Sequence, residues 1–308
     1  MDDSGIISPD ELTDESTTRI VQTKRWKIKI NEAGDGQPVF MLHGTGPGAT
    51  GWSNFNQNFR ALASKYRVIL VDAPGWGQSD PLDPAEGGMS GTSHVDALKL
   101  LMDELAIEKA VVVGNSMGGQ TTLRFCATHP ERVTHAVTMG AGLFGTNIFS
   151  PGGLSEGIRI IVDTYRDPSP ENFRRLVNIM VFDSSFVTDE LVKQRSAAAL
   201  ADKLHLENWL KAWGARRSGG GGQASLAEQL GRFQQPCLFI HGRDDRVVPM
   251  EGTLRAVSVV PNSRAVILNR CGHWAQVEHA AEFNALLDSF LTRTASGAPA
   301  TDNKAFGS

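Results

Sequence analysis

The sequence has no long hydrophobic run, few cysteines and no excess of positive charge. No apolar segment approaches the ~18 residues that a membrane-spanning helix needs. The first residues are acidic, unlike the basic and apolar start of a secretory signal. Lysine and arginine total 30 against 34 aspartates and glutamates, a formal net charge of −4, which disfavours a polyanion as partner. The composition therefore indicates a protein that binds neither nucleic acid nor a membrane.

The cysteines indicate a reduced compartment. Cys126, Cys237 and Cys271 are an odd number and show no C-x-x-C spacing, so we expect them to be buried and free, in a cytoplasmic protein. The glycine run at 219–222 lacks the lysine and the preceding strand of a phosphate-binding loop. Neither a metal nor a cofactor is expected.

The apolar pattern predicts an α/β fold with a parallel, doubly wound sheet. An alternating segment at 20–30 suggests an antiparallel hairpin, and short buried runs then alternate with helix-length segments. The predicted parallel strands are 39–42, 68–71, 110–113, 133–138, 238–240 and 265–268. The predicted helices of this core are 57–64, 93–105, 119–128, 251–259 and 280–292. With 308 residues, 41% of them hydrophobic, the chain is long enough for one sizeable core.

The alternation stops in the middle of the chain, which divides the sequence into parts. Residues 19–143 and 231–294 form the predicted core, and residues 144–230 form a helical lid inserted after the sixth strand. Within this lid, helices are expected at 154–164, 170–182, 188–201 and 206–215, and the glycine run serves as a flexible return to the core. Residues 1–18, which are acidic, are expected to be a mobile arm, and residues 295–308 a disordered tail.

A serine stands between two glycines directly after a strand. Residues 110–119 read A-V-V-V-G-N-S-M-G-G, which is the G-x-S-x-G pattern of a nucleophile at a sharp strand-to-helix turn. Small residues at Gly114 and Gly118 let the two arms of the turn approach each other. Ser116 is therefore the candidate nucleophile.

An acid and a histidine follow in the order that such a serine requires. The run 237–240 leads into H-G-R-D-D-R-V-V-P, where Asp244 and Asp245 compete for the orienting role. We favour Asp245, three residues after the glycine and just before a Val-Pro pair, and interpret Asp244 as a turn former. The last strand ends in N-R-C-G-H-W, which places His273 at the same edge of the sheet. The other seven histidines are interpreted as structural or surface residues.

A glycine-rich loop follows the first parallel strand and suits an oxyanion hole. Residues 43–54 read H-G-T-G-P-G-A-T-G-W-S-N. Glycines let backbone N–H groups approach a ligand closely. The expected donors are the N–H groups of Thr45 and of Met117, the residue after the nucleophile.

Four stretches together resemble the meta-cleavage product hydrolases, α/β-hydrolases of bacterial aromatic degradation. They are H-G-T-G-P-G-A-T-G-W-S-N-F, G-N-S-M-G-G, F-D-S-S-F-V-T-D-E-L-V-K-Q-R and C-G-H-W-A-Q-V-E-H. The resemblance implies an α/β-hydrolase fold and hydrolysis of a carbon–carbon bond in a 2-hydroxy-6-oxohexa-2,4-dienoate. The products would be 2-hydroxypenta-2,4-dienoate and a carboxylic acid. The family commonly forms dimers or larger assemblies, so a homo-oligomer is expected.

The resemblance also implies substrate contacts. Arg195 would bind the substrate carboxylate and the C2 oxygen, a task that suits a planar guanidinium. The sequence alone favours a solvated helix arginine at this position. Asn115 has the alternative of capping the turn, and Trp274 that of simple packing. The expected substrate-binding residues are Gly46, Asn54, Asn115, Arg195, Trp274, Met180, Phe182 and Phe144.

Other reactions remain open at this point. A serine esterase or lactonase acting on small esters needs the same triad without Arg195. A binding protein that kept the fold is disfavoured by the intact Ser116, Asp245 and His273. A haloalkane dehalogenase would need an aspartate in place of Ser116. For the dienoate reaction, an acyl-enzyme and a serine that only positions water are alternatives, and the substituent at C6 is open.

Overall fold

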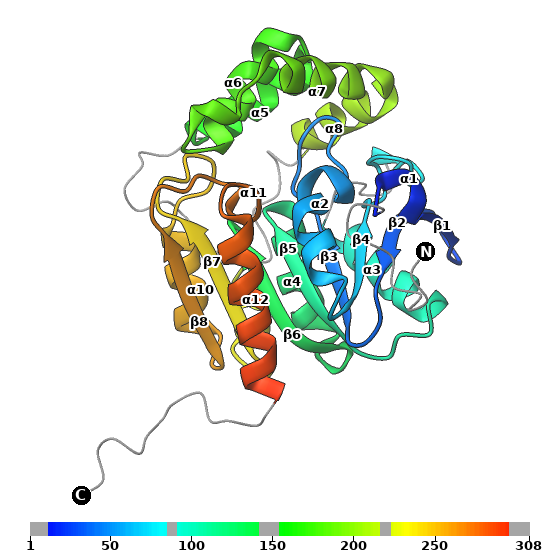
Figure 1. The fold of residues 1–308 in the computed structure, drawn as a ribbon, viewed down its shortest axis with the longest axis vertical. Coiled ribbons are helices and arrows are strands. Elements are labelled where there is room, and N and C mark those ends of the chain that lie inside the picture. The colour runs from blue at the N-terminus through cyan, green and yellow to red at the C-terminus, as the bar shows by residue number, and fades with distance from the viewer. Residues whose placement is uncertain (1–11, 85–90, 142–153, 216–222, 296–308) are drawn as a thin grey trace, which may run out of the picture.

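One mostly parallel sheet forms the centre of the molecule (Figure 1). The computed structural model describes residues 12–84, 91–141, 154–215 and 223–295, and in this part eight strands pair in the order β1-β2-β4-β3-β5-β6-β7-β8. The bounds are β1 Thr18–Gln22, β2 Lys27–Ala33, β3 Pro38–Leu42, β4 Arg67–Val71, β5 Ala110–Asn115, β6 Val133–Met139, β7 Cys237–Gly242 and β8 Ser263–Leu268. The pairs β1·β2 and β2·β4 are antiparallel and all other neighbours are parallel. The predicted α/β class is confirmed.

Strand β5 is apolar on both faces because helices cover both sides of the sheet. All six of its residues are buried. Ala110 and Val112 belong to one hydrophobic cluster, and Val111 and Val113 to the other. Alternate residues of a strand point to opposite faces, so a strand inside two layers of helices reads as a continuous apolar run. The sequence predicts the strand before Ser116 from this apolar run.

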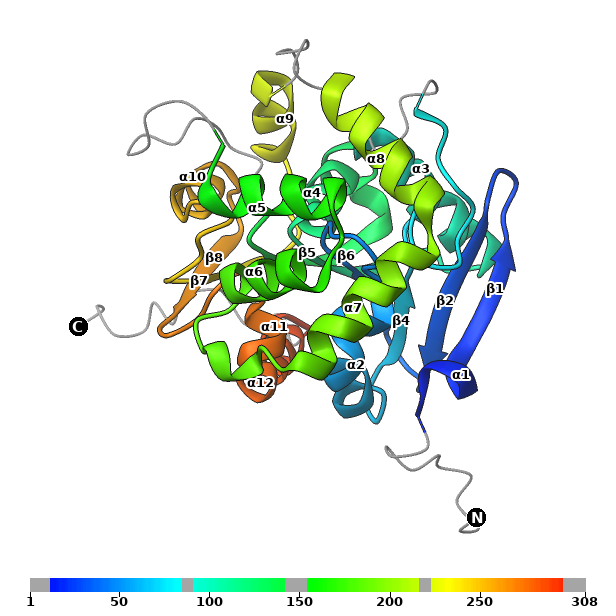
Figure 2. The same ribbon diagram turned by 90° about the horizontal axis from the view of Figure 1, so that it is seen from above.

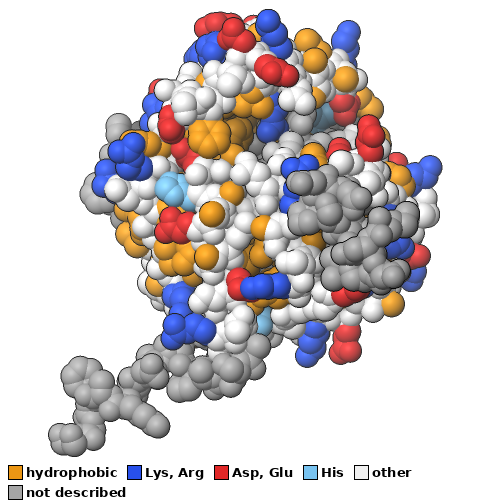
Figure 3. Space-filling view, in the orientation of Figure 1, with side chains coloured by type: hydrophobic (Ala, Val, Ile, Leu, Met, Phe, Trp, Pro, Cys, Tyr) orange, Lys and Arg blue, Asp and Glu red, His pale blue; other side chains and the backbone are white. Residues whose placement is uncertain are grey.

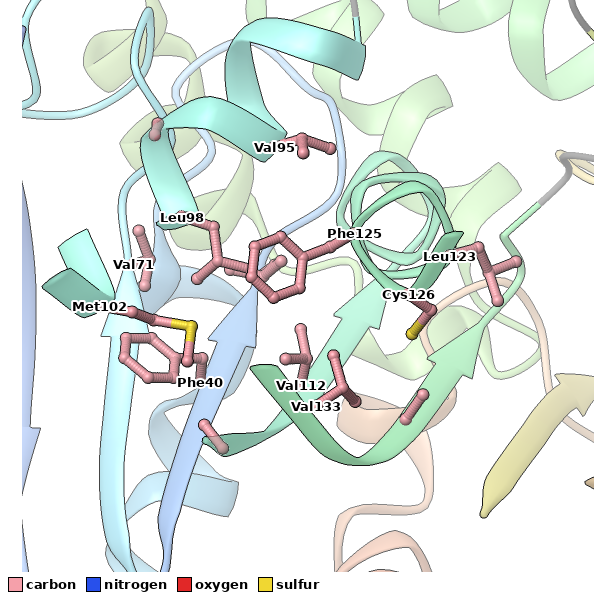
Figure 4. Packing of buried hydrophobic residues seen from close by; sticks show 14 of the residues in the cluster. Phe40, Val71, Val95, Leu98, Met102, Val112, Leu123, Phe125, Cys126 and Val133 are labelled. Carbon is pink, nitrogen blue, oxygen red and sulfur yellow. The ribbon is translucent and has the colours of Figure 1, made fainter. Parts of the chain in front are cut away.

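The two layers of helices have separate apolar contacts with the sheet. Their bounds are α2 Gly51–Leu62, α3 Gly91–Glu104, α4 Met117–Thr128, α9 Gln223–Leu230, α10 Glu251–Val259, α11 Ala275–Glu278 and α12 Ala280–Ala295, with a 3₁₀ turn at Pro130–Arg132. Helices α3, α4, α9 and α10 share one cluster with the sheet, and α2, α11 and α12 share the other. Figure 4 shows the first cluster, where Leu98, Met102 and Phe125 lie against Phe40 and Val112 of the sheet.

Helix α2 begins six residues before the predicted start at 57. Thr50 caps it, because its hydroxyl accepts a hydrogen bond from the N–H of Ser53, and the Ser53 hydroxyl accepts one from the N–H of Thr50. This reciprocal capping satisfies two donors at the helix start. The helix therefore begins directly at the glycine-rich loop and holds its end in place.

Four helices form the lid above the carboxyl ends of the strands (Figures 1 and 2). They are α5 Glu156–Arg166, α6 Pro170–Met180, α7 Asp189–Ala201 and α8 Lys203–Ala215, with a 3₁₀ turn at Ser184–Phe186. They have their own apolar cluster, which includes Ile161, Tyr165 and Phe173. The predicted lid boundary at 230 is wrong, because Leu226 and Leu230 of α9 pack in the core cluster beside α4. The glycine run at 219–222 lies outside the described residues.

The end of the predicted mobile arm is part of the folded core. A short helix α1, Asp14–Thr17, follows Leu12, which is 5% exposed and packs in the α2 cluster. Asp14 accepts hydrogen bonds from the buried Lys29 ammonium (2.7 Å) and from the Asn31 amide (2.9 Å). A buried ammonium is costly unless it is paired, so these contacts hold residues 12–17 against the hairpin. The prediction of a mobile arm is wrong for these residues, and residues 1–11 and 296–308 lie outside the described part.

The described surface fits the modest net charge. Positive and negative side chains are interspersed on the face shown in Figure 3. Among the described residues, no helix has the length and apolar character that crossing a membrane requires.

Candidate active site

Ser116 lies at the turn between β5 and α4 in a strained backbone conformation. Its φ is 52° and its ψ is −112°, a region that costs energy for a residue with a side chain. A Cβ on Gly114 would lie 2.2 Å from the carbonyl oxygen of Gly118, and one on Gly118 would lie 2.1 Å from that of Leu42. Only glycine fits at both positions. The N–H of Ser116 donates to the carbonyl of Met139 (2.7 Å), which fixes the turn to β6.

Asp245 and His273 form a hydrogen-bonded pair at the same edge of the sheet. Asp245 Oδ2 lies 2.7 Å from His273 Nδ1, and both side chains are 2% exposed. The other carboxylate oxygen, Oδ1, accepts the N–H groups of Val247 (2.8 Å) and Val248 (2.9 Å). Burial alone would raise the pKa of Asp245, but the charge and hydrogen bond of His273 and the other donors hold it below its usual value.

This pairing leaves His273 ready to act as a base. An ionised carboxylate only accepts hydrogen bonds, so the proton of a neutral imidazole lies on Nδ1 and Nε2 has a free lone pair. Ser116 Oγ makes no hydrogen bond to any other described residue, and its side chain is not paired with His273 in this structure. Catalytic hydrogen bonds are often long without substrate. Asn115 connects the two regions, because its Nδ2 donates to the main-chain carbonyl of His273 (3.3 Å).

Asp244 lies apart from this pair. Its carboxylate is 3.7 Å from the guanidinium of Arg243, and its N–H donates to the carbonyl of Cys271. Asp244 lies in a turn, as predicted, and this turn is closed by the hydrogen bond from the N–H of Asp245 to the carbonyl of Gly242 (3.1 Å). The Asp244 side chain makes no hydrogen bond to the described backbone, unlike the side-chain bond that was expected. Between the two acids, the geometry favours Asp245 as the partner of His273.

Gly140 was not predicted from the sequence, yet it leaves room for the Asp245–His273 pair. It follows β6 with a φ of 52°. A Cβ there would lie 2.8 Å from His273 Cε1 and 3.2 Å from Asp245 Oδ2. The glycine directly after a predicted strand could have indicated a special backbone position. The sequence does not reveal that the side chains of His273 and Asp245 approach it.

The loop after β3 lies against the nucleophile. A Cβ on Gly44 would come within 3.2 Å of the Cβ of Ser116, and the N–H of Gly44 donates to Asn54 Oδ1 (3.3 Å). The N–H groups of Thr45 and Met117 make no hydrogen bond within the described part of the chain. Both N–H groups are therefore available to a developing oxyanion.

Side chains from the lid and, through Trp76, from the core hold this loop. Trp209 Nε1 donates to the hydroxyl of Thr45 (3.1 Å), and the Tyr165 hydroxyl lies 3.5 Å from the same oxygen. Trp76 Nε1 donates to the carbonyl of Gly46 (3.2 Å). The Trp209 ring stacks on Tyr165 with 3.7 Å between centroids. Gly46 therefore contributes its carbonyl to the support of the loop.

Arg195 lines a cavity beside the glycine-rich loop at 43–54. The cavity measures about 210 Å³, and its lining includes Ser53, Asn54, Arg195, Trp274 and Val277. Arg195 Nη2 donates to the carbonyl of Ser53 (3.3 Å), and its Cζ lies 5.8 Å from the Trp274 ring centre. No carboxylate pairs with it in the described part of the chain. Burial lowers the pKa of Arg195, but a guanidinium stays charged in proteins, so the cavity wall offers an unneutralised cation.

Other predicted substrate contacts have different positions. Asn115 is fully buried, and its Nδ2 donates to the main-chain carbonyls of Met139 (3.4 Å) and His273 (3.3 Å), neither of which belongs to the turn that it was alternatively expected to cap. Met180 is 1% exposed, and its carbonyl accepts the N–H groups of His273 and Trp274. Phe182 is 42% exposed and lies under the guanidinium of Arg270, so its prediction as a pocket residue is wrong. Phe144 lies outside the described residues.

Acid should weaken the lid through His205, which is buried beside Tyr165. Its Nε2 lies 3.2 Å from the Tyr165 hydroxyl, and burial lowers the pKa of His205 from 6.5 to about 4. Between these values the unfolded chain binds a proton that the folded chain does not, so stability falls as pH drops from 6.5 towards 4. We expect His205 to account for about 3 kcal/mol of this loss.

Urea denaturation at pH 7.5 and at pH 4.5 checks the contribution of His205. The loss of stability on acidification should be smaller in His205→Gln than in the unaltered protein. His129→Gln, at a more exposed site, is the matched control. An equal acid loss in the unaltered chain and His205→Gln would contradict the assignment.

Comparisons with known proteins bear on the family and the fold of the chain. The sequence model described as the alpha/beta hydrolase fold matches residues 37–280. The chain is 43% identical over 286 residues to the 2-hydroxy-6-oxononadienedioate/2-hydroxy-6-oxononatrienedioate hydrolase of Cupriavidus pinatubonensis, covering 91% of this chain and 97% of that one. It is 39% identical to the 2-hydroxy-6-oxo-6-phenylhexa-2,4-dienoate hydrolase of Burkholderia cepacia, covering 91% and 98%. The solved structure of a 2-hydroxy-6-oxo-6-phenylhexa-2,4-dienoate hydrolase from a Rhodococcus species has a TM-score of 0.78 and 29% identity, covering 90% and 100%.

Proposed function

The chain belongs to the α/β-hydrolase fold family and, within it, to the hydrolases of meta-cleavage products, and on this basis we propose that it hydrolyses a carbon–carbon bond in a 2-hydroxy-6-oxohexa-2,4-dienoate. The products are 2-hydroxypenta-2,4-dienoate and the carboxylic acid that carries the C6 substituent. The observation that carries this proposal is Arg195, which pairs with no carboxylate in the described part of the chain and lines a cavity together with Trp274, the residue that follows His273 of the Asp245–His273 pair. A plain esterase needs the pair without a cation in its pocket.

Arg195 and the triad have separate tasks in this reaction. A carbon leaving group departs only if its electrons have somewhere to go, so the dienol first becomes a keto form whose departing carbon is conjugated with the C2 carbonyl. Arg195 binds the C1 carboxylate and the C2 oxygen, where charge accumulates. Asn54 and Trp274 line the same cavity. His273, held by Asp245, moves the proton during this tautomerisation.

Ser116 then acts as the nucleophile. Its oxygen bonds to C6 while His273 Nε2 takes its proton, and the N–H groups of Thr45 and Met117 stabilise the oxyanion. The C5–C6 bond breaks, and its electron pair moves through the conjugated system onto the C2 oxygen beside Arg195. The released dienolate takes the proton from His273 at this oxygen and becomes 2-hydroxypenta-2,4-dienoate. Water, deprotonated by His273, hydrolyses the acyl-serine and releases the acid. Water attack assisted by the serine is the alternative, and acid quenching during a single turnover separates the two.

The substitution Arg195→Gln tests the assignment of the cation. We expect it to raise KM for a yellow ring-fission dienoate by roughly 30-fold or more, because a charge-assisted contact is lost. Hydrolysis of a neutral ester should stay near the level of the unaltered protein. Loss of dienoate colour measures turnover, with a phenyl-substituted and a dicarboxylate dienoate as substrates.

Arg174→Gln is the control, because this lid arginine is more exposed and pairs with Asp189. An unaltered protein that hydrolyses simple esters and leaves both dienoates intact would favour an esterase or lactonase. Equal dienoate kinetics in Arg195→Gln and the unaltered chain would remove Arg195 from the substrate site.

We also propose a homo-oligomer in the reducing cytoplasm. The family resemblance supports the first point. The three buried, free cysteines support the second. Light scattering coupled to size-exclusion chromatography measures the assembly.

A further inference from the structure

The lid and the loop that carries His273 are joined through main-chain groups. The carbonyl of Met180, the last residue of α6, accepts hydrogen bonds from the N–H groups of His273 (2.8 Å) and Trp274 (3.2 Å). A Cβ on Gly272 would lie 2.6 Å from the same carbonyl oxygen. The position of the lid at residue 180 therefore bears directly on the position of the base.

One carboxylate connects the two segments a second time. Glu278, the last residue of α11, accepts the N–H of Gly272 on Oε2 (2.6 Å). Its Oε1 accepts the N–H groups of Phe182 (2.6 Å) and Asp183 (3.1 Å) from the lid. Three backbone donors from two distant parts of the chain thus meet on a single side chain.

Gly272 is confined from the opposite side as well. A Cβ on Gly242, at the end of β7, would lie 2.0 Å from the carbonyl oxygen of Gly272. Gly242 begins the turn that bears Asp245, so Gly272 is held between the acid-bearing turn and the lid. A displacement of Gly272 moves the adjacent His273 relative to Asp245.

The connection also borders the substrate cavity. Val181 from the lid, Trp274 from the histidine loop and Val277 from α11 all line that cavity. Val181 precedes Phe182, whose N–H donates to the Glu278 carboxylate. Trp274 itself donates to the Met180 carbonyl, and Val277 directly precedes Glu278. The chain continues from Asp183 into α7, which carries Arg195.

We propose that Glu278 is a positioning residue for the carbon–carbon bond hydrolysis, which couples the lid to His273 through its three backbone hydrogen bonds. This inference rests on the proposed function for its substrate. Glu278 itself does not touch the reacting atoms; it sets the distance between the lid wall of the cavity and the base.

Only a carboxylate satisfies this arrangement. An ionised carboxylate accepts hydrogen bonds on both oxygens and donates none, and its bonds to backbone N–H groups are stronger than those of a neutral acceptor. The amide of glutamine has nearly the same shape but would point N–H groups at Gly272 or at Phe182. One side of the connection is then lost while the packing volume is kept.

The substitution Glu278→Gln tests the proposal, with Glu282→Gln as the control. Glu282 lies four residues further along the chain and is near His279 (3.3 Å), outside this connection. In Glu278→Gln, we expect kcat for the dienoate to fall by about 10- to 100-fold and KM to rise, because small misplacements of the base and the cavity wall are costly. Kinetics are measured well below the melting temperature of each variant.

Hydrogen–deuterium exchange gives a readout that does not depend on the dienoate. In Glu278→Gln, exchange should be faster in peptides that contain Phe182 and Asp183 and in those that contain Gly272. In Glu282→Gln, the exchange rates of the same peptides should not change. If Glu278→Gln does not fold, Glu278→Asp keeps the charge on a shorter side chain and should lose protection at one of the two segments.

The outcomes separate the inference from the proposed function. A lower melting temperature with unchanged kcat, KM and exchange at both segments would show a merely structural role and overturn the coupling. If the unaltered chain hydrolyses esters and no dienoate, the proposed function fails. In that case the exchange data and the ester kcat still decide the coupling.

Discussion

Replacing Ser116 by alanine is expected to lower kcat for the dienoate by at least about 10³-fold while changing substrate Kd by no more than about threefold. The serine side chain supplies the bond-forming oxygen, and its removal leaves the oxyanion hole, Arg195 and the cavity in place. The strained turn around Ser116 tolerates alanine at least as well as serine, since both carry one Cβ. Stopped-flow absorbance of the yellow substrate measures binding and single turnover separately.

The control for this substitution is Ser258→Ala, on the exposed surface of α10, which should leave all constants unchanged. Ser116→Ala with nearly full activity would refute the nucleophile assignment. Acid quenching of the unaltered protein during a single turnover, followed by mass spectrometry, should give an acyl group on Ser116. Its absence at every time point would count against the covalent route and favour attack by water.

Asp245→Asn should reduce kcat by about 10⁴-fold, a loss typical of reversing the tautomer of a catalytic imidazole. Val247 and Val248 donate N–H groups to Oδ1, so the amide oxygen of asparagine takes that place. The amide nitrogen then takes the place of Oδ2 and points its N–H at His273 Nδ1. The imidazole proton moves to Nε2, which leaves no lone pair for the proton of Ser116.

Asp244→Asn is the matched control, because it makes the same chemical change one residue earlier, beside Arg243. In steady-state assays, kcat of this variant should stay within about threefold of that of the unaltered protein, as expected for a substitution outside the site. The reverse ranking of the two variants would transfer the orienting role to Asp244. A pH–rate profile of Asp245→Asn should show recovery of activity at high pH, where hydroxide can assist the removal of the serine proton.

The sheet and the turn that carries Ser116 were predictable because their sequence signals are local. Buried parallel strands such as β5 read as short apolar runs, and Gly114 and Gly118 mark the turn around Ser116. The order of acid and histidine follows from the fold. The start of α2 was missed because the capping pair Thr50 and Ser53 lies inside a glycine-rich segment that reads as a loop.

Contacts between distant main-chain groups could not be predicted. The bonds from His273 and Trp274 to the carbonyl of Met180 join residues more than 90 positions apart, and any residue except proline can donate them. Glu278 was one of many acids in the sequence. Phe182 was misplaced because α6 ends at Met180, which turns the chain outward to the surface at Arg270.

The pairing of Asp14 with Lys29 limits where the polypeptide can be shortened. A chain that begins at the β1–β2 hairpin would lack Leu12 and Asp14. The loss of Leu12 would expose apolar surface on α2. The loss of Asp14 would leave the Lys29 ammonium with only Asn31 (2.7 Å) and Asp72 (3.9 Å) as partners. Truncations that remove the acidic residues at the N-terminus should therefore stop before residue 12.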